Sequence, residues 1–336
     1  MLVDIPESCL ATVDGLRSDG GIFDTEFDSR KVRILYINGS KDGESYIRKW
    51  KTYADELFIT NKYILDYDLR KYVFSGCVES LKITNYGSYT LADISFMTNL
   101  KDITICEGSS STYSIILLSD LIFPVSLEKI SIDYVHRDIM SNTVFPENLK
   151  ILAIWKTCNL QIKNIVLPIG LKELHLGSSD SLQYISLPIG LKKLGISSIA
   201  DFIMLDKIET HENLKKIIVG FIDDVCVECV IVKIPMSVTH IDIFYSSFLK
   251  HMIFESPITK LTLRGSVDNL DDLPYGLEKL ILWCGVPKII SNLPMCLRKI
   301  KLNDFIDRDS NAFCSKIERL PYGCIVVNKN GKILRK

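Results

Sequence analysis

The chain has 336 residues and a mass of 38.1 kDa, which is enough for one large domain or two ordinary ones. Hydrophobic residues make up 47% and charged residues 24%, a composition typical of a folded protein with a core and not of a disordered one. The 40 basic and 41 acidic side chains leave a net charge of -1, which excludes binding to nucleic acid or membranes by bulk charge alone.

Residues 1–31 form an acidic segment at the start of the chain. They hold seven Asp and Glu residues and two arginines, and the sequence Ser18-Asp19-Gly20-Gly21 is typical of a turn. The first residues lack the basic and apolar stretches of a secretory signal. We therefore expect residues 1–31 to be an N-terminal cap or arm. We expect the protein to be intracellular, either cytoplasmic or, if viral, in a particle or the host cytoplasm.

A repeat with a step near 22 residues begins after this segment. Each copy has apolar side chains at its first, fourth and sixth positions, as in Leu171, Leu174 and Leu176. Eight of the eleven prolines share one phase of this repeat, three residues before a first position. The thirteen copies begin at Val32, Ala54, Val78, Leu100, Leu127, Leu149, Leu171, Leu191, Leu214, Val238, Ile258, Leu277 and Leu297.

The apolar positions of each copy predict a short strand. Side chains two residues apart on a strand face the same side, and a proline just before the strand loses no ladder hydrogen bond. A single unit cannot bury its apolar edge, whereas stacked units can. The repeat therefore predicts a β-rich α/β solenoid over residues 32–323, a leucine-rich-repeat-like right-handed coil. We expect one long parallel sheet of about 13–14 short strands, with mostly extended or 3-10 return segments.

The frame Leu-Pro-x-x-Leu-Lys-x-Leu-x-Leu resembles the FNIP-type leucine-rich repeats of social amoebae and giant DNA viruses. The resemblance covers residues 120–324 well and residues 32–120 loosely. The Phe-Asn pair that usually follows the strand in that family is missing from this sequence, and residues 5–16 are too short for an F-box. The resemblance implies an interaction scaffold, and it leaves open a viral protein in host–virus interaction or in the virion.

The C-terminal residues 324–336 contain two short apolar runs around the sequence Asn330-Gly331. Asn-Gly between apolar runs is a strong hairpin signal. We expect a hairpin that forms the C-terminal cap of the solenoid.

Ten cysteines are spaced irregularly, apart from Cys226 and Cys229. Without a second pair at similar spacing, these two residues fit no common zinc pattern, and we expect free thiols. We expect neither a metal nor a cofactor.

The residues between the buried positions project from the strand face, and many of them are lysines. Strand pairing stacks such residues about 4.8 Å apart, so they form a ridge of like charge from Leu127 onward. These lysines either bind an acidic partner or a phosphate backbone, or they are a row of solvated side chains with no binding role. The lysines selected as binding candidates are Lys172, Lys193, Lys216, Lys279 and Lys299.

Aromatic residues recur at the end of the strands. Trp155, Phe244 and Trp283 occupy the seventh position of their copies, and Tyr134 occupies the eighth. Exposed Trp and Tyr residues are common anchors of protein interfaces. The alternative is that neighbouring turns pack around these rings.

The sequence contains no Gly-rich phosphate loop, no His-Glu-x-x-His and no Gly-x-Ser-x-Gly motif. We therefore predict a non-enzymatic scaffold that binds a protein partner through its strand face. The alternative is a structural assembly or virion component that packs through the solenoid surface. Nucleic-acid binding through the lysine ridge is a weaker third hypothesis. We expect no membrane partner, since the longest apolar stretch, residues 115–125, is too short to span a bilayer.

Overall fold

The computed structural model describes a chain that divides into two compact units. Unit 1 comprises residues 1–175 and 184–188, and unit 2 comprises residues 176–183 and 189–336. The residues that the structure describes are 15–18, 32–39, 54–61, 78–85, 93–107, 121–133, 143–155, 165–177, 182–208, 211–220, 231–244, 246–255, 257–265, 267, 270, 273–283, 290–303 and 310–336.

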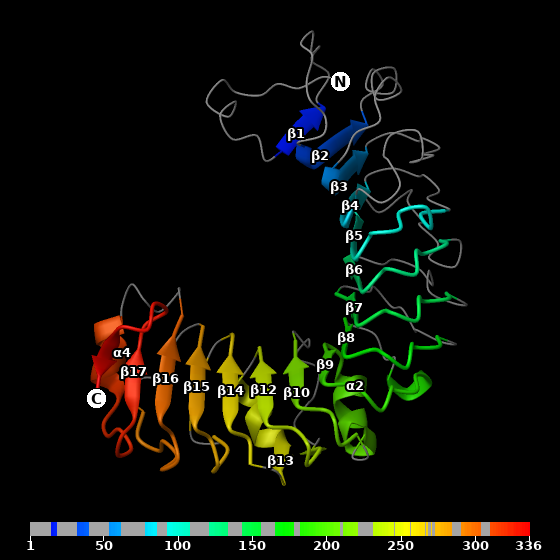
Figure 1. Cartoon of the computed structure of the whole chain (residues 1–336). Coiled ribbons are helices and arrows are strands. Elements are labelled where there is room, and N and C mark those ends of the chain that lie inside the picture. The colour runs from blue at the N-terminus through cyan, green and yellow to red at the C-terminus, as the bar shows by residue number, and fades with distance from the viewer. Residues whose placement is uncertain are drawn as a thin grey trace, which may run out of the picture. The chain divides into compact units, whose positions relative to one another are not determined.

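Unit 1 is built from strands that lie side by side in chain order (Figure 1). The pairs from β1 to β7 are all parallel. The strands are β1 (Gly15–Ser18), β2 (Val32–Gly39), β3 (Ala54–Asn61), β4 (Ser80–Asn85), β5 (Asp102–Glu107), β6 (Lys129–Asp133), β7 (Ile151–Ile154) and β8 (Glu173–Leu176).

Unit 2 continues the same pattern of one strand per repeat. Its strands pair in parallel up to β17, and β18 closes the sheet as an antiparallel neighbour of β17. They are β9 (Lys193–Ile196), β10 (Lys216–Val219), β12 (His240–Ile243), β14 (Lys260–Leu263), β15 (Lys279–Leu282), β16 (Lys299–Leu302), β17 (Ile325–Val327) and β18 (Ile333–Arg335).

All thirteen repeat copies therefore carry a strand where the sequence predicts one, and the predicted leucine-rich-repeat-like solenoid is confirmed. β1 lies within residues 1–31, where we expected a cap or arm, and it pairs in parallel with β2. The hairpin expected near the C-terminus is present as β17 and β18, with Gly331 at a φ of +84° in the turn. The division into a solenoid over residues 32–323 and two caps stays a prediction.

The core of each coil is the apolar triplet of the repeat. Leu171, Leu174 and Leu176 have exposed fractions of 0%, 0% and 2%. In unit 2, residues at the fourth repeat position are partners in register from one strand to the next, so each side chain packs on its counterpart in the neighbouring coil.

The prolines before the strands start a tight turn. The backbone N–H of Leu171 donates to the carbonyl oxygen of Pro168 at 3.1 Å, and Leu297 donates in the same way to Pro294 at 3.0 Å. Proline has no N–H to lose and accepts through its carbonyl, so it suits the first position of this turn. The predicted place of proline, just outside the ladder, is confirmed.

The return segments of unit 2 contain 3-10 turns, as predicted, together with short helices and strands that were not. An α-helix of five residues, α2, is started by Ser198, whose side chain accepts a hydrogen bond from the N–H of Asp201. The elements are η5 (Leu182–Tyr184), α2 (Ile199–Ile203), η6 (Met204–Ile208), η8 (Ser246–His251), α4 (Ser310–Lys316) and the parallel pair β11 (Val232–Ile234) and β13 (Met252–Phe254).

No helix among the described residues is both long and apolar enough to pass through a membrane.

Candidate functional site

The strand face of unit 2 carries a column of basic side chains, one on each of six neighbouring strands. They stand at the first position of their strands, and the strand register pairs each with the next. All six are partly exposed. We call the set the cationic column: Lys193, Lys216, His240, Lys260, Lys279 and Lys299. Four of the five selected lysines, all except Lys172, belong to it.

The charges of the column act on one another. The pKa of Lys279 is lowered, first by partial burial and then by the positive charges of Lys260, Lys299 and Lys301. The pKa of His240 is lowered by burial and by Lys260, Lys216 and Lys279. In both cases the positive charges of neighbouring lysines add to the effect of burial, so the column is an electropositive strip.

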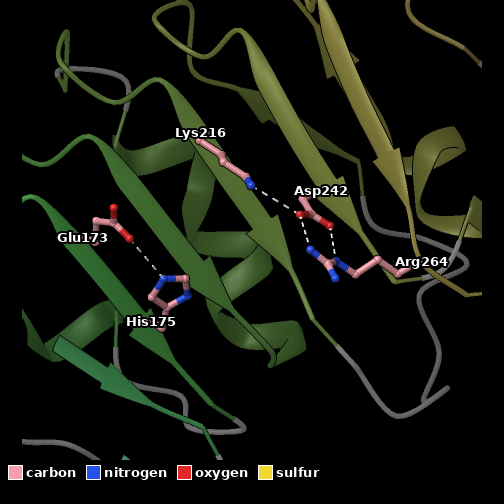
Figure 2. A network of polar contacts seen from close by, with 5 residues as sticks. All are labelled: Glu173, His175, Lys216, Asp242 and Arg264. Carbon is pink, nitrogen blue, oxygen red and sulfur yellow. Dashed lines mark hydrogen bonds and ion pairs between the residues drawn. The ribbon is translucent and has the colours of Figure 1, made fainter. Parts of the chain in front are cut away.

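One acid lies within this strip. Asp242, two residues after His240 on β12, is 1% exposed. Its Oδ1 accepts a hydrogen bond from Nε of Arg264 at 2.7 Å, and its Oδ2 accepts from Nη2 at 2.9 Å. Nζ of Lys216 donates to the same Oδ2 at 3.3 Å. Figure 2 shows Asp242 held between these two cations. Lys216 lies on β10 and Arg264 directly follows β14, and these two strands flank β12.

Asp242 leaves the strip positive. It is the only acid at the first and third positions of these six strands, all of which are described residues. The hydrogen bond to Asp242 raises the pKa of its partner Arg264, so the guanidinium keeps its positive charge. One carboxylate therefore stands against seven basic side chains, if Arg264 and Lys301 are counted with the five lysines of the column.

Two of the predicted aromatic residues lie on the same side of the sheet, where the strands end. The backbone N–H groups of Phe244, Arg264 and Trp283 continue the ladder, with bonds of 3.0, 2.9 and 2.9 Å to the preceding coil. The guanidinium carbon of Arg264 lies 5.0 Å from the centroid of the Trp283 ring, a cation–π contact. Phe244 is 39% exposed. Arg264 thus connects the buried carboxylate to an aromatic ring.

The predicted residues of unit 1 have different surroundings. Trp155 is 47% exposed, and its ring lies over His175 with centroids 4.8 Å apart. His175 is itself buried, with Nε2 3.9 Å from Glu173 Oε2 (Figure 2). Lys172 is exposed on the strand side of a tight turn. Tyr134 lies outside the described residues, as do Cys226 and Cys229.

The lysine ridge expected from Leu127 onward is interrupted by acids in unit 1. Lys150 pairs with Glu128 at 2.8 Å, and Lys101 pairs with Glu79 at 3.1 Å. These side chains occupy the second repeat position. They form exposed ion pairs of little energetic weight. The third repeat position, which holds the cationic column in unit 2, is occupied in unit 1 by Ile34, Glu56, Ser80, Asp102, Lys129, Ile151 and Glu173. The run of like charge is therefore a feature of unit 2.

Sequence reasoning missed Asp242 and Arg264. Each lies on the same face as the column, since positions two residues apart on a strand share a face. Their pairing joins residues 22 apart, which is one repeat step. An alignment of the charged residues by repeat position would therefore have placed Asp242 and Arg264 on neighbouring coils.

No group of three or more His, Cys, Asp or Glu side chains that could hold a metal ion is present in the described ranges.

Residues 139–179 match the family model of the FNIP repeat. The match confirms the resemblance that the repeat frame indicates, and it covers the copies that begin at Leu149 and Leu171. No curated protein sequence matches the chain. One solved structure with a similar fold is described as the crystal structure of CroV588, a novel circular LRR protein. It is 17% identical, with a TM-score of 0.45, and the match covers 82% of this chain and 43% of that chain. The chain thus spans less than half the length of that solved relative.

Proposed function

We propose that the protein is a non-enzymatic interaction scaffold that binds a partner protein through the strand face of unit 2. The observation that carries this proposal is the shared face of the cationic column, Phe244 and Trp283. Solenoids with FNIP and leucine-rich repeats offer extended surfaces of this kind, on which the backbone is constant and the projecting side chains vary.

The chemistry of this face supports binding. Arg and Trp are enriched among the residues that dominate interface energies, and Arg264 and Trp283 lie in contact. The ion pair with Asp242 fixes the guanidinium, so a partner would meet an ordered group and would lose less side-chain entropy on binding.

Comparison of aromatic variants tests the proposal. Wild-type protein would be used to capture partners from the native cells, and the captured partners would be identified. Each partner would then be purified, and its affinity for the protein would be measured by calorimetry. The double variant Phe244→Ala/Trp283→Ala should weaken binding at least about tenfold, since each ring of this kind contributes about 1–2 kcal/mol at an interface. Its circular dichroism and melting temperature should stay close to wild type.

The matched control is Trp155→Ala, which removes an exposed ring from unit 1. It should bind like wild type. Equal affinity of the double variant and wild type for every captured partner would show that the strand face of unit 2 is not the binding surface.

A second candidate function is lateral assembly, and a separate observation favours it. In unit 2 the residue directly after the turn proline is apolar in five copies and between 71% and 100% exposed in each. We call this set the turn column: Ile189, Met236, Tyr275, Met295 and Tyr322. Large exposed apolar side chains in a row are typical of contact surfaces, and a symmetric pair of copies could bury them against each other.

Light scattering after size-exclusion chromatography tests assembly. Wild-type protein should form a dimer or larger species at micromolar concentration, and Tyr275→Ser/Met295→Ser/Tyr322→Ser should be monomeric. A monomeric wild type would contradict this candidate. If the protein is viral, high copy number in purified particles would support a role as a virion component, and its absence there would count against one.

A further inference from the structure

We propose that the cationic column binds an extended, acidic protein segment in which Asp or Glu residues are interspersed with apolar ones. This inference rests on the proposed function, because it names the chemistry of the partner at the same face. The column runs across the strands, so the segment would cross β9 to β16 from coil to coil.

Like charges are closely spaced along the column. Neighbouring strands lie about 4.8 Å apart, and like charges directly opposite each other on a sheet are destabilising. The column nevertheless keeps a basic or titratable side chain on six strands in succession. A carboxylate placed between the basic side chains of two neighbouring strands would attract both of them and would reduce the repulsion between them.

The single acid at the first and third positions of these six strands already has basic partners. Asp242 is buried and accepts from both Arg264 and Lys216. The following strands, β14 to β16, carry the partly exposed Lys260, Lys279 and Lys299. Two residues later on the same strands stand Thr262, Ile281 and Lys301. An incoming anion would therefore meet the column between β14 and β16 without competing with Asp242.

Apolar side chains lie beside the charges of the column. Ile218 on β10 and Ile281 on β15 are partly exposed, and each lies two residues after a lysine of the column on the same face. Apolar side chains between the acids of the ligand would contact them. The six strands of the column are separated by five spacings of about 4.8 Å, which together span about 24 Å. About seven residues of extended chain cover that distance.

The aromatic geometry favours a protein segment over single-stranded nucleic acid. Nucleic-acid channels stack bases on open aromatic faces. Here the guanidinium of Arg264 covers one face of Trp283, and its hydrogen-bonding fork is held by Asp242. The remaining cations are lysines, which act as point charges and suit scattered carboxylates.

Fluorescence anisotropy with the full chain and three labelled probes tests the proposal. The probes are a decapeptide that alternates Glu with Leu or Tyr, the same peptide with Gln for Glu, and ten-residue oligothymidine. The acidic peptide should bind at 50 mM salt at least tenfold more tightly than the Gln peptide and the oligonucleotide. Raising salt to 300 mM should weaken binding of the acidic peptide about tenfold, since added salt screens the attraction between exposed charges.

Charge variants locate the site. Lys260→Gln/Lys279→Gln/Lys299→Gln should weaken binding of the acidic peptide at least tenfold. The control Lys207→Gln/Lys250→Gln/Lys332→Gln removes three exposed lysines of unit 2 outside the column and should change affinity less than twofold. Both triple variants should retain the wild-type circular dichroism spectrum.

Three outcomes would overturn the inference: equal affinity for the Glu and Gln peptides, equal losses in the two triple variants, or tighter binding of the oligonucleotide. The proposed function fails separately. If a captured partner no longer binds Phe244→Ala/Trp283→Ala but still binds the triple lysine variant of the column, the strand face binds a protein, but the ligand of the column is not an acidic segment.

Discussion

Asp242 on β12 and Arg264, the residue directly after β14, form a two-point ion pair, with Nε to Oδ1 at 2.7 Å and Nη2 to Oδ2 at 2.9 Å. The side chain of Asp242 is 2% exposed, whereas that of Arg264 is 37% exposed. A buried carboxylate is costly without donors, so the pair makes the stability of the sheet depend on a residue at its surface.

Replacing Arg264 by methionine should destabilise unit 2. The change keeps the bulk of the side chain but leaves Asp242 with Lys216 as a donor at 3.3 Å. We expect a loss of about 2 kcal/mol in the free energy of unfolding, less than for a fully buried pair because Arg264 is partly in water. Urea unfolding followed by circular dichroism measures it.

The double variant Arg264→Met/Asp242→Asn should recover part of this loss, because the uncompensated charge is then removed. The control Arg298→Met changes an exposed arginine of unit 2 and should stay within about 0.5 kcal/mol of wild type. Unchanged stability of Arg264→Met would show that the ion pair is not maintained in solution.

His240 should make stability fall on acidification. Burial and the charges of Lys260, Lys216 and Lys279 lower its pKa from the ordinary value of about 6.5. Below pH 6.5 the unfolded chain therefore binds more protons than the native chain at this site. The contribution of His240 to stability is complete above about pH 6.5 and is lost as the pH falls toward the lowered pKa.

Melting temperatures at pH 7.5 and 5.5 test this dependence. The drop between the two values should be smaller in His240→Gln than in wild type. It should also be smaller in Lys260→Gln, because Lys260 has the largest effect on the imidazole among the neighbouring charges. If wild type and His240→Gln lose the same number of degrees, the column does not repel a proton at this position.

The sequence predicts the strands well because the repeat encodes them locally. Apolar side chains at the first, fourth and sixth positions, with a proline ahead of them in seven of the thirteen copies, define the strands without knowledge of their neighbours. β1 was missed because residues 15–18 carry neither signal. α2 was missed because its start depends on Ser198 and on the buried Asp201, whose carboxylate also accepts from the N–H of Leu182 in another segment.

The site could be predicted only in part. Register alone stacks Lys193 to Lys299, so the column follows from the repeat phase. The contacts of Asp242 with Arg264, and of Trp155 with His175, occur once each among the described copies and depend on which residue occupies the neighbouring coil. In unit 1, Lys150 forms an ion pair with Glu128 in place of the predicted stack of like charges.

Glycine at position 265 is required by a close backbone approach. Its N–H donates to the carbonyl oxygen of Phe244 at 2.6 Å, and a Cβ at this position would collide with that oxygen. Gly265→Ala should therefore cost about 1–3 kcal/mol, because the backbone must move. At Gly276 the nearest atom to an added Cβ is Pro257 Cβ at 3.3 Å, so Gly276→Ala should change stability by less than about 1 kcal/mol. Equal melting temperatures for the two variants would contradict this difference.

The coil at Leu174 offers the most direct test of the stacked core. Leu174 is fully buried at the fourth repeat position of β8, whereas Lys172, two residues earlier, is exposed. Leu174→Asp removes a side chain whose burial is worth roughly 1.5–3 kcal/mol and places a carboxylate among leucines, so the loss in unfolding free energy should exceed about 3 kcal/mol. Lys172→Asp adds the same carboxylate at the surface and should stay within about 0.5 kcal/mol of wild type. Urea unfolding of the two variants gives both values. A Leu174→Asp protein as stable as Lys172→Asp would mean that the repeat has been assigned the wrong phase, with its leucines toward water.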